Sequence, residues 1–109
     1  MILENPKRAT ISTNTNGNTT LVAAPTSPAY LVVDKLVLIP TAAGTATIVG
    51  GSTPLTGGMP LAANTMYNFS NDCQVPDGVF QCAAGTALVL TLDSTFNVNG
   101  FVIYRIRNF

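Results

Sequence analysis

The apolar stretches of this chain are short, and residues that end regular structure separate them. Thr, Val and Ile dominate the stretches, while Gly, Pro and Asn recur between them. No segment repeats apolar residues at the i, i+3, i+4, i+7 spacing for long enough to form a helix. Because runs of β-branched residues bounded by turn formers are typical of strands, the sequence predicts an all-β fold.

The pattern predicts eight strands that follow one another at short intervals. Their expected ranges are Lys7–Ser12, Asn18–Ala23, Tyr30–Ile39, Gly44–Val49, Met66–Ser70, Val79–Cys82, Ala87–Leu92 and Gly100–Arg107. Asn16-Gly17 is the preferred dipeptide of a type I′ turn, so it predicts a hairpin between the first two strands. Eight short strands in 109 residues are typical of a β-sandwich or a jelly roll.

We therefore expect an all-β, single-domain antiparallel β-sandwich, jelly-roll-like, with an extended N-terminal arm. The arm and the first strand would occupy residues 1–12, and the sandwich would occupy residues 13–109. Alternate residues of a strand point to opposite faces. In the last strand, Val102, Tyr104 and Ile106 would thus point into the core, while Arg105 and Arg107 would face water.

One third of the chain carries no charge. No Lys, Arg, Asp or Glu occurs from Leu36 to Asn71. Charged residues make up 9% of the whole chain and the net charge is zero, whereas an ordinary globular domain has about 25% charged residues. A protein with so little charge repels its own copies weakly and tends to associate. Part of the uncharged surface is therefore expected to be buried against other chains.

Residues 51–64 read GSTPLTGGMPLAAN and fit no strand well, since Gly and Pro interrupt any regular ladder. Leu55, Met59 and Leu61 are the apolar side chains of this segment. We expect a long connection that packs down on the sandwich; a merely flexible loop is the alternative. Long loops without secondary structure are uncommon in compact domains and are often functional.

The residue inventory argues against catalysis. The chain has no His, which excludes nucleophiles activated by His and metal sites with His ligands. Asp34, Asp72, Asp77 and Asp93 form no recognisable pair for acid–base chemistry. The Gly-rich connection lacks the Lys and the following helix of a phosphate-binding loop. We expect no enzymatic activity, no cofactor and no metal site.

The loop that follows the fifth predicted strand leaves two questions open. Asn71, Asp72 and Asp77 carry oxygen atoms that bind Ca²⁺ in other proteins, but the calcium-loop pattern is absent, and a hydrogen-bonded turn is the favoured interpretation. Cys73 and Cys82 would form a disulfide if they face each other on neighbouring strands. In a protein assembled in a cytosol, two reduced thiols are the favoured state.

The basic residues are few and scattered along the sequence. They are Lys7, Arg8, Lys35, Arg105 and Arg107, and five acids balance them. Without a basic stripe, neither nucleic acid nor a membrane surface is an expected partner. The first ten residues, MILENPKRAT, lack the basic and apolar regions of a signal peptide, which indicates synthesis and folding in a cytosol.

Three segments of the second half carry a resemblance to a known group. Gly51–Asn64 matches the pattern G-x-T-x-L-(S/T)-G-x-M-x-L-A-A-N, and Gly78–Leu92 matches a hairpin with the pattern G-x-F-x-(T/C)-A-A-G-x-A-L-x-(L/V)-x-L. Val98–Tyr104 matches the start of the final strand. In this order and spacing, covering roughly residues 30–107, the chain is similar to small structural proteins of tailed double-stranded DNA bacteriophages. That group often carries an acid where this chain has Thr86.

The understood members of that group are head decoration proteins, also called cement proteins. The resemblance implies a virion protein that is made in the cytoplasm of a bacterial host and sits on the outside of the icosahedral head. It also implies two partners, the major capsid protein and further copies of the chain in a homotrimer or homodimer. Another structural role in the virion, such as head–tail joining, is compatible with the same sequence.

Within this hypothesis, six apolar residues are candidate contacts to the capsid or to a sister subunit. They are Ile2, Leu3 and Pro6 of the arm, and Leu55, Met59 and Leu61 of the long connection. One side of the connection would complete the core while the other makes the contact, and the arm would reach a neighbour by adding a strand or filling a pocket. A disordered terminus is the alternative for the arm.

The rival hypothesis is a carbohydrate-binding or receptor-binding module of a phage tail or fibre. Sugar sites usually expose aromatic rings beside acids and amides. Tyr30, Tyr67, Phe69 and Phe96 are the available rings, and the chain has no Trp. We expect most of these rings to belong to the core.

Overall fold

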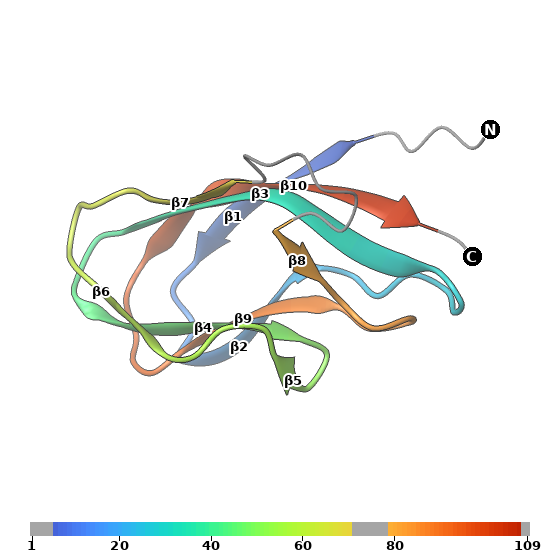
Figure 1. The fold of residues 1–109 in the computed structure, drawn as a ribbon. Coiled ribbons are helices and arrows are strands. Elements are labelled where there is room, and N and C mark those ends of the chain that lie inside the picture. Colours follow the sequence, from blue (N-terminus) through green and yellow to red (C-terminus); the bar gives the residue numbers. More distant parts are fainter. Residues whose placement is uncertain (1–5, 71–78, 108–109) are drawn as a thin grey trace.

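The computed structural model describes residues 6–70 and 79–107, and these residues form strands, turns and loops with no helix among them (Figure 1). The strands are β1 (Lys7–Thr13), β2 (Gly17–Val22), β3 (Tyr30–Pro40), β4 (Gly44–Gly50), β5 (Thr53–Pro54), β6 (Met59–Leu61), β7 (Tyr67–Ser70), β8 (Phe80–Gln81), β9 (Leu88–Leu92) and β10 (Val98–Arg107). All eight predicted strands are present, with ends shifted by two residues or fewer. Over the described ranges, no helix is long and apolar enough to span a membrane.

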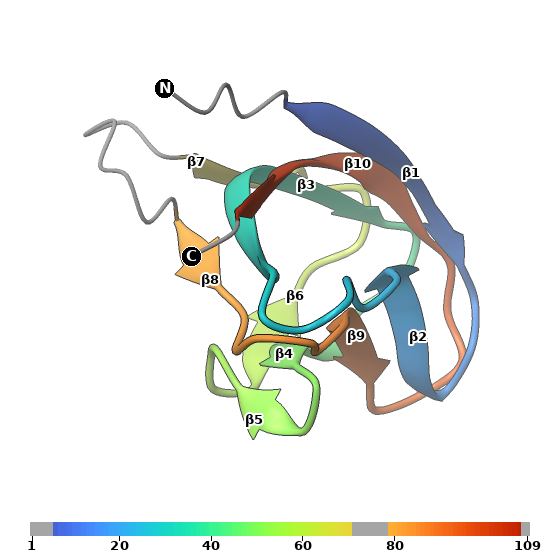
Figure 2. The same ribbon diagram turned by 90° about the vertical axis from the view of Figure 1, so that its right-hand side faces the viewer.

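The strands form two antiparallel sheets that pack face to face (Figures 1 and 2). Sheet A has the order β1-β10-β3-β7, with β8 also pairing with β3. Sheet B has the order β2-β9-β4-β5, with β6 also pairing with β4. The chain passes repeatedly from one sheet to the other, and the first strand of each sheet pairs with one of the last two strands of the chain. This is the Greek-key order of a jelly roll, which confirms the predicted fold class.

The predicted hairpins are wrong, because both turns carry the chain from one sheet to the other. β1 pairs with β10, whereas β2 pairs with β9, so Asn16 and Gly17 lie in a crossover. Gly17 has the positive φ of +101° that a tight turn needs. The segment matched over Gly78–Leu92 likewise places β8 in sheet A and β9 in sheet B. A turn dipeptide determines local geometry, but burial of the strands' apolar faces decides which partner each strand takes.

The long connection also differs from expectation, because two short strands lie within it. β5 and β6 both pair with β4, and the main-chain N–H of Leu55 donates to the carbonyl oxygen of Ile48 at 2.7 Å. The hydroxyl of Thr56 accepts the N–H of Ile48 at 3.1 Å. Residues 51–64 are therefore anchored along the edge of sheet B, where Pro54 and Pro60 are tolerated because an edge strand leaves N–H positions unused.

The core lies between the sheets and is built by the inward residues of nearly every strand. Its fully buried large side chains include Leu31, Leu36, Leu38, Ile48, Leu88, Leu90, Leu92, Val98 and Val102. Val102 has no exposed surface, and Tyr104 and Ile106 pack against the same cluster from β10. The predicted inward face of the last strand is thus confirmed.

A bulge at Asp34 explains why β3 alternates imperfectly. Lys35 pairs with Ile103 and Val33 pairs with Tyr104, so Asp34 has no partner on β10. The extra residue lets Asp34 and Lys35 both lie on the outer side, while the apolar residues before and after them remain in phase with the core. Asp34 accepts two hydrogen bonds from Arg105, at 2.7 Å from Nε and 2.9 Å from Nη2.

Candidate functional site

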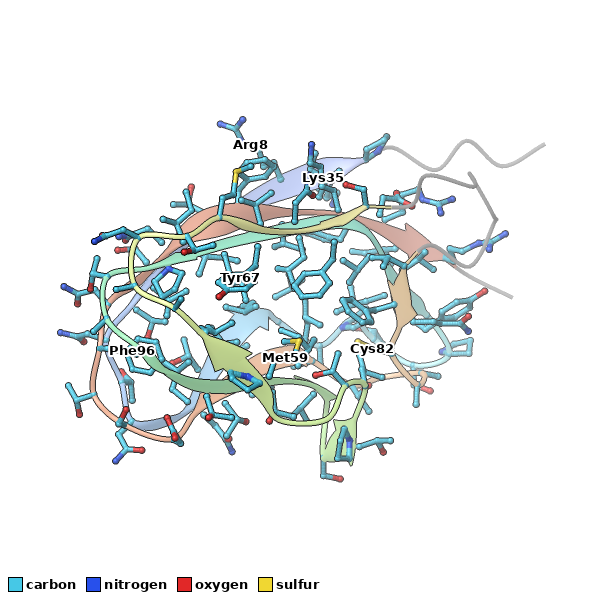
Figure 3. The ribbon with its side chains drawn as sticks, turned by 60° about the vertical axis from the view of Figure 1, so that its left-hand side comes forward. Arg8, Lys35, Met59, Tyr67, Cys82 and Phe96 are labelled. Carbon is cyan, nitrogen blue, oxygen red and sulfur yellow. The ribbon has the colours of Figure 1, made fainter. Side chains whose placement is uncertain are left out.

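The predicted contact residues of the long connection serve the core. Leu61 is 4% exposed and belongs to the core cluster. Leu55 and Met59 are half-buried and pack against the same cluster, and Met59 lies between the two layers in Figure 3. The prediction that this segment packs down on the sandwich is confirmed. Its remaining surface is formed by small polar residues, Gly and Pro.

The predicted contact residues of the arm lie at the edge of the described part of the chain. Ile2 and Leu3 lie outside the described residues. Pro6 is exposed and directly precedes β1. β1 is an edge strand of sheet A that pairs with β10 over seven residues without a bulge. The arm would therefore continue from a regular edge strand, which is the geometry that strand addition uses.

The outer face of sheet B carries no charged side chain. The five strands β2, β4, β5, β6 and β9 contain no Lys, Arg, Asp or Glu. By strand register, the outward residues of this face are Asn18, Thr20, Thr45, Thr47, Val49, Pro54, Pro60, Val89 and Thr91. The hydroxyl of Thr91 donates to Oδ1 of Asn18 at 2.7 Å across neighbouring strands. We call this surface the neutral face.

Asp93 is the one charged residue that the structure describes beside the neutral face. Its Oδ1 accepts the main-chain N–H of Thr45 at 2.9 Å. This hydrogen bond, with a weaker contribution from the hydroxyl of Ser94, lowers the pKa of Asp93 below its ordinary value. The carboxylate thus holds the start of β4 against the end of β9, which is a structural task.

The outer face of sheet A has the opposite character, because basic side chains gather on it. By strand register, its outward residues include Arg8, Thr10, Ser12, Lys35, Val37, Ile39, Asn68, Ser70, Asn99, Phe101, Ile103, Arg105 and Arg107. Arg8 and Lys35 point away from the sandwich, whereas Tyr67, Cys82 and Phe96 lie between the layers (Figure 3). We call this surface the basic face.

Four of the five basic residues of the chain lie together on the basic face, although they are scattered along the sequence. Asp34 is its one described acid, so the described residues of this face carry four cations and one acid. Glu4, Asp72 and Asp77 lie outside the described residues. This grouping was not predicted from the sequence. The signal was that every basic residue falls in the first, third or last predicted strand.

Two contacts hold cations of the basic face in place, one with an aromatic ring and one with a carboxylate. The guanidinium carbon of Arg8 lies 5.7 Å from the centroid of the Phe101 ring, within the range of a cation–π contact. Arg105 forms the bidentate pair with Asp34, and the two side chains are 16% and 24% exposed. The face therefore combines oriented positive charge with aromatic and aliphatic surface.

The aromatic rings considered for a sugar site are used in packing. Tyr30 is 9% exposed and Phe96 is 6% exposed. Tyr67 and Phe69 are half-buried against the core, and Phe69 packs on Phe80 with ring centroids 5.8 Å apart. The hydroxyl oxygen of Tyr67 also accepts the N–H of Ala62. As expected, these rings stabilise the fold, and they do not form an exposed stacking platform.

The described residues hold few groups with chemical reactivity. Within these ranges, no cluster of three or more His, Cys, Asp or Glu residues could hold a metal ion. No buried side-chain nitrogen or oxygen atom there lacks a hydrogen-bond partner. Asn71, Asp72, Asp77 and Cys73, the residues of the calcium and disulfide questions, lie outside the described residues.

Cys82 is a free thiol that is 1% exposed. Burial raises the pKa of this thiol to about 11 from its ordinary 9.0 because the anion loses its hydration. Since only the thiolate is nucleophilic, a rise of two pKa units lowers the reactive fraction at neutral pH about 100-fold.

We therefore expect Cys82 to react with Ellman's reagent slowly in the folded protein and rapidly after denaturation. The measurement uses a Cys73→Ser variant, so that Cys82 is the only thiol, and Cys82→Ser is the control. Equal rates before and after denaturation would show that Cys82 is accessible in the folded state.

No family model matches the chain, and neither the curated proteins nor the solved structures searched gave a match. The case for a function therefore rests on the fold, the two unlike faces and the motifs of the sequence.

Proposed function

We propose that this protein is a non-enzymatic structural protein of a bacteriophage virion, a decoration protein that binds the outer surface of the icosahedral head. In this role it bridges neighbouring copies of the major capsid protein and stabilises the shell. The observation that carries the proposal is the neutral face, a whole sheet surface without charge in a protein that has charge on its other sheet. The jelly roll is also a fold common among viral capsid proteins, and the sequence motifs point the same way.

The neutral face suits contact between identical copies. Two copies that meet through it bring no like charges together, and its Thr and Val side chains pack without costly desolvation of ions. A standard interface buries about 1,600 Å² in total, or about 800 Å² on each partner. The whole described chain exposes 5843 Å², so one such contact would use a modest part of the surface. We therefore propose a homodimer or homotrimer.

The stabilising action would follow from linkage. A protein that binds only the assembled shell adds RT ln(1 + [L]/Kd) of stability at each site. Many copies on one head multiply a modest gain at each site. Such a protein needs a rigid core and adhesive faces, and it needs no catalytic group.

The test is the number of copies of this chain per purified virion of its own phage, measured against the major capsid protein by quantitative mass spectrometry. We expect hundreds of copies, because a decoration protein occupies sites over the whole head. A handful of copies would assign it to the tail or to a receptor-binding role, and absence from the virion would overturn the proposal.

A further inference from the structure

We propose that the basic face of sheet A is the surface that docks on the partner, and that the docking site on the partner is an acidic protein surface with apolar residues beside its acids. This inference rests on the proposed function, since it names the chemistry by which the chain would hold the capsid. It assigns opposite tasks to the two faces. The neutral face meets further copies of the chain, and the basic face meets a different protein.

The first support is the position of the cations. Arg8, Lys35, Arg105 and Arg107 come from three neighbouring strands, β1, β3 and β10, and their strand register places them on the same side. The five basic residues are scattered along the sequence, so the gathering of four cations with one acid among the described residues of this face results from how the fold arranges them. A potential of one sign on one face steers and orients a partner of the opposite sign.

The second support is independent of charge. Ile39 and Met66 are the two exposed large apolar side chains of the described residues, at 39% and 61% exposure. Ile39 is an outward residue of the basic face, and Met66 directly precedes β7 of the same sheet. Ile39 follows Leu38, which points inward from β3, and Met66 precedes Tyr67, the residue of β7 that pairs with Leu38. The two apolar side chains therefore lie next to each other on the outer side, close to Val37 and Phe101.

Protein interfaces combine exposed apolar side chains with polar and charged contacts beside them, and this face places Ile39 and Met66 at one end and its cations further along the same strands. Nucleic acid fits less well. Its affinity comes from cations that neutralise many phosphates, whereas here Arg105 is already paired with Asp34 and Arg8 is held over an aromatic ring. A second copy of the chain fits less well too, because two basic faces would repel each other.

The test compares three charge reversals on one sheet. Arg8→Glu and Lys35→Glu reverse cations of the basic face. Lys7→Glu is the matched control, because Lys7 is the neighbour of Arg8 in β1, is exposed, and takes the opposite register position. The net charge changes equally in all three variants. Each variant is mixed with heads of its own phage that lack this protein, and the bound fraction is measured by co-sedimentation over a range of protein and salt concentrations.

We expect Arg8→Glu and Lys35→Glu each to raise the Kd about tenfold or more, and Lys7→Glu to change it about twofold or less. Binding of the wild type should weaken as salt rises. The substitution Met66→Asp, which introduces an acid, should also weaken binding to heads. In contrast, Thr20→Asp on the neutral face should leave the affinity of each subunit for heads unchanged. Thermal unfolding of every variant establishes that it is folded.

The outcomes separate the two proposals. If all three charge-reversal variants bind heads as tightly as the wild type does, the basic face is not the docking surface, whereas the decoration role remains in place. Equal weakening by all three would show that only net charge matters, which also overturns the basic face as the docking surface. Failure of the wild type to bind heads would overturn both proposals. Binding to double-stranded DNA with the same dependence on Arg8 and Lys35 would replace the acidic protein by nucleic acid.

Discussion

Replacement of Gly100 by Ala is expected to destabilise the fold strongly and to leave a cooperative but much weaker unfolding transition. Gly100 lies in β10 opposite Leu38 and has a φ of +152°, a value that residues with a side chain rarely adopt. A Cβ atom at this position would overlap the carbonyl oxygen of Val37 and lie 2.8 Å from its carbonyl carbon. Strain of the backbone and overlap with a main chain that cannot rotate away each cost about 1–3 kcal/mol.

Together these terms amount to about 2–6 kcal/mol, against a total stability of about 5–15 kcal/mol for a typical domain. The chain offers two graded controls. Gly57→Ala has no heavy atom within 4 Å of the added Cβ and should be nearly neutral. Gly17→Ala has the same open space but a φ of +101°, so it isolates the conformational term. Urea unfolding followed by circular dichroism should rank the losses as Gly57, Gly17 and Gly100, in increasing order. Equal stability of the Gly57 and Gly100 variants would contradict the close approach of β10 and β3.

The strands themselves were predictable because each carries its own signal. Alternation in β10 identified the inward side chains of Val102, Tyr104 and Ile106, and Gly and Pro marked the ends of most strands. Strand propensity and burial pattern act over a few neighbouring residues, so the sequence contains them directly. The number of strands then narrowed the architecture to two packed sheets.

The pairing of the strands was harder to predict from the sequence, because it depends on residues far apart in the chain. Asn16-Gly17 satisfies the rules for a hairpin, yet β1 and β2 lie in different sheets. One hydrogen bond between the hydroxyls of Thr13 and Thr19, at 2.9 Å, links the two strands across the turn. The turn residue supplies the required φ, whereas the partner of each strand is selected by the apolar faces that must be covered.

The two faces of the candidate site were only half predictable. The lack of charge from Leu36 to Asn71 identified β4, β5 and β6 as parts of an unusual surface. The basic face could not be recognised without the topology, because Arg8, Lys35 and Arg105 meet only when β1 and β3 both pair with β10. Charge that is scattered along a sequence can therefore gather on one face, and net charge alone does not describe it.

The bulge in β3 leads to a second prediction with a large effect. Deletion of Asp34 should leave a folded protein, because Val33 and Lys35 would then be consecutive and would still point to opposite faces. The main loss would be the ion pair with Arg105, worth about 1–3 kcal/mol for a partly buried bidentate pair. The substitution Asp34→Ala removes the same ion pair and keeps the chain length, so it should cost about the same.

Deletion of Val37 in the same strand should prevent folding. Without Val37, the preceding residues of β3 shift by one position along the strand. Either all of them then change face, or the bulge at Asp34 absorbs the shift. In the second case Lys35 takes the position of Leu36, which has no exposed surface in the wild type. An unpaired charge in the core costs about 3–5 kcal/mol, and the loss of the leucine adds about 2–5 kcal/mol. The measurement is soluble yield and urea unfolding of both deletion variants and of Asp34→Ala. A cooperative transition for the variant that lacks Val37, or none for the variant that lacks Asp34, would show that the extra residue of β3 lies elsewhere. The register that places Lys35 and Arg105 on one face would then be wrong as well.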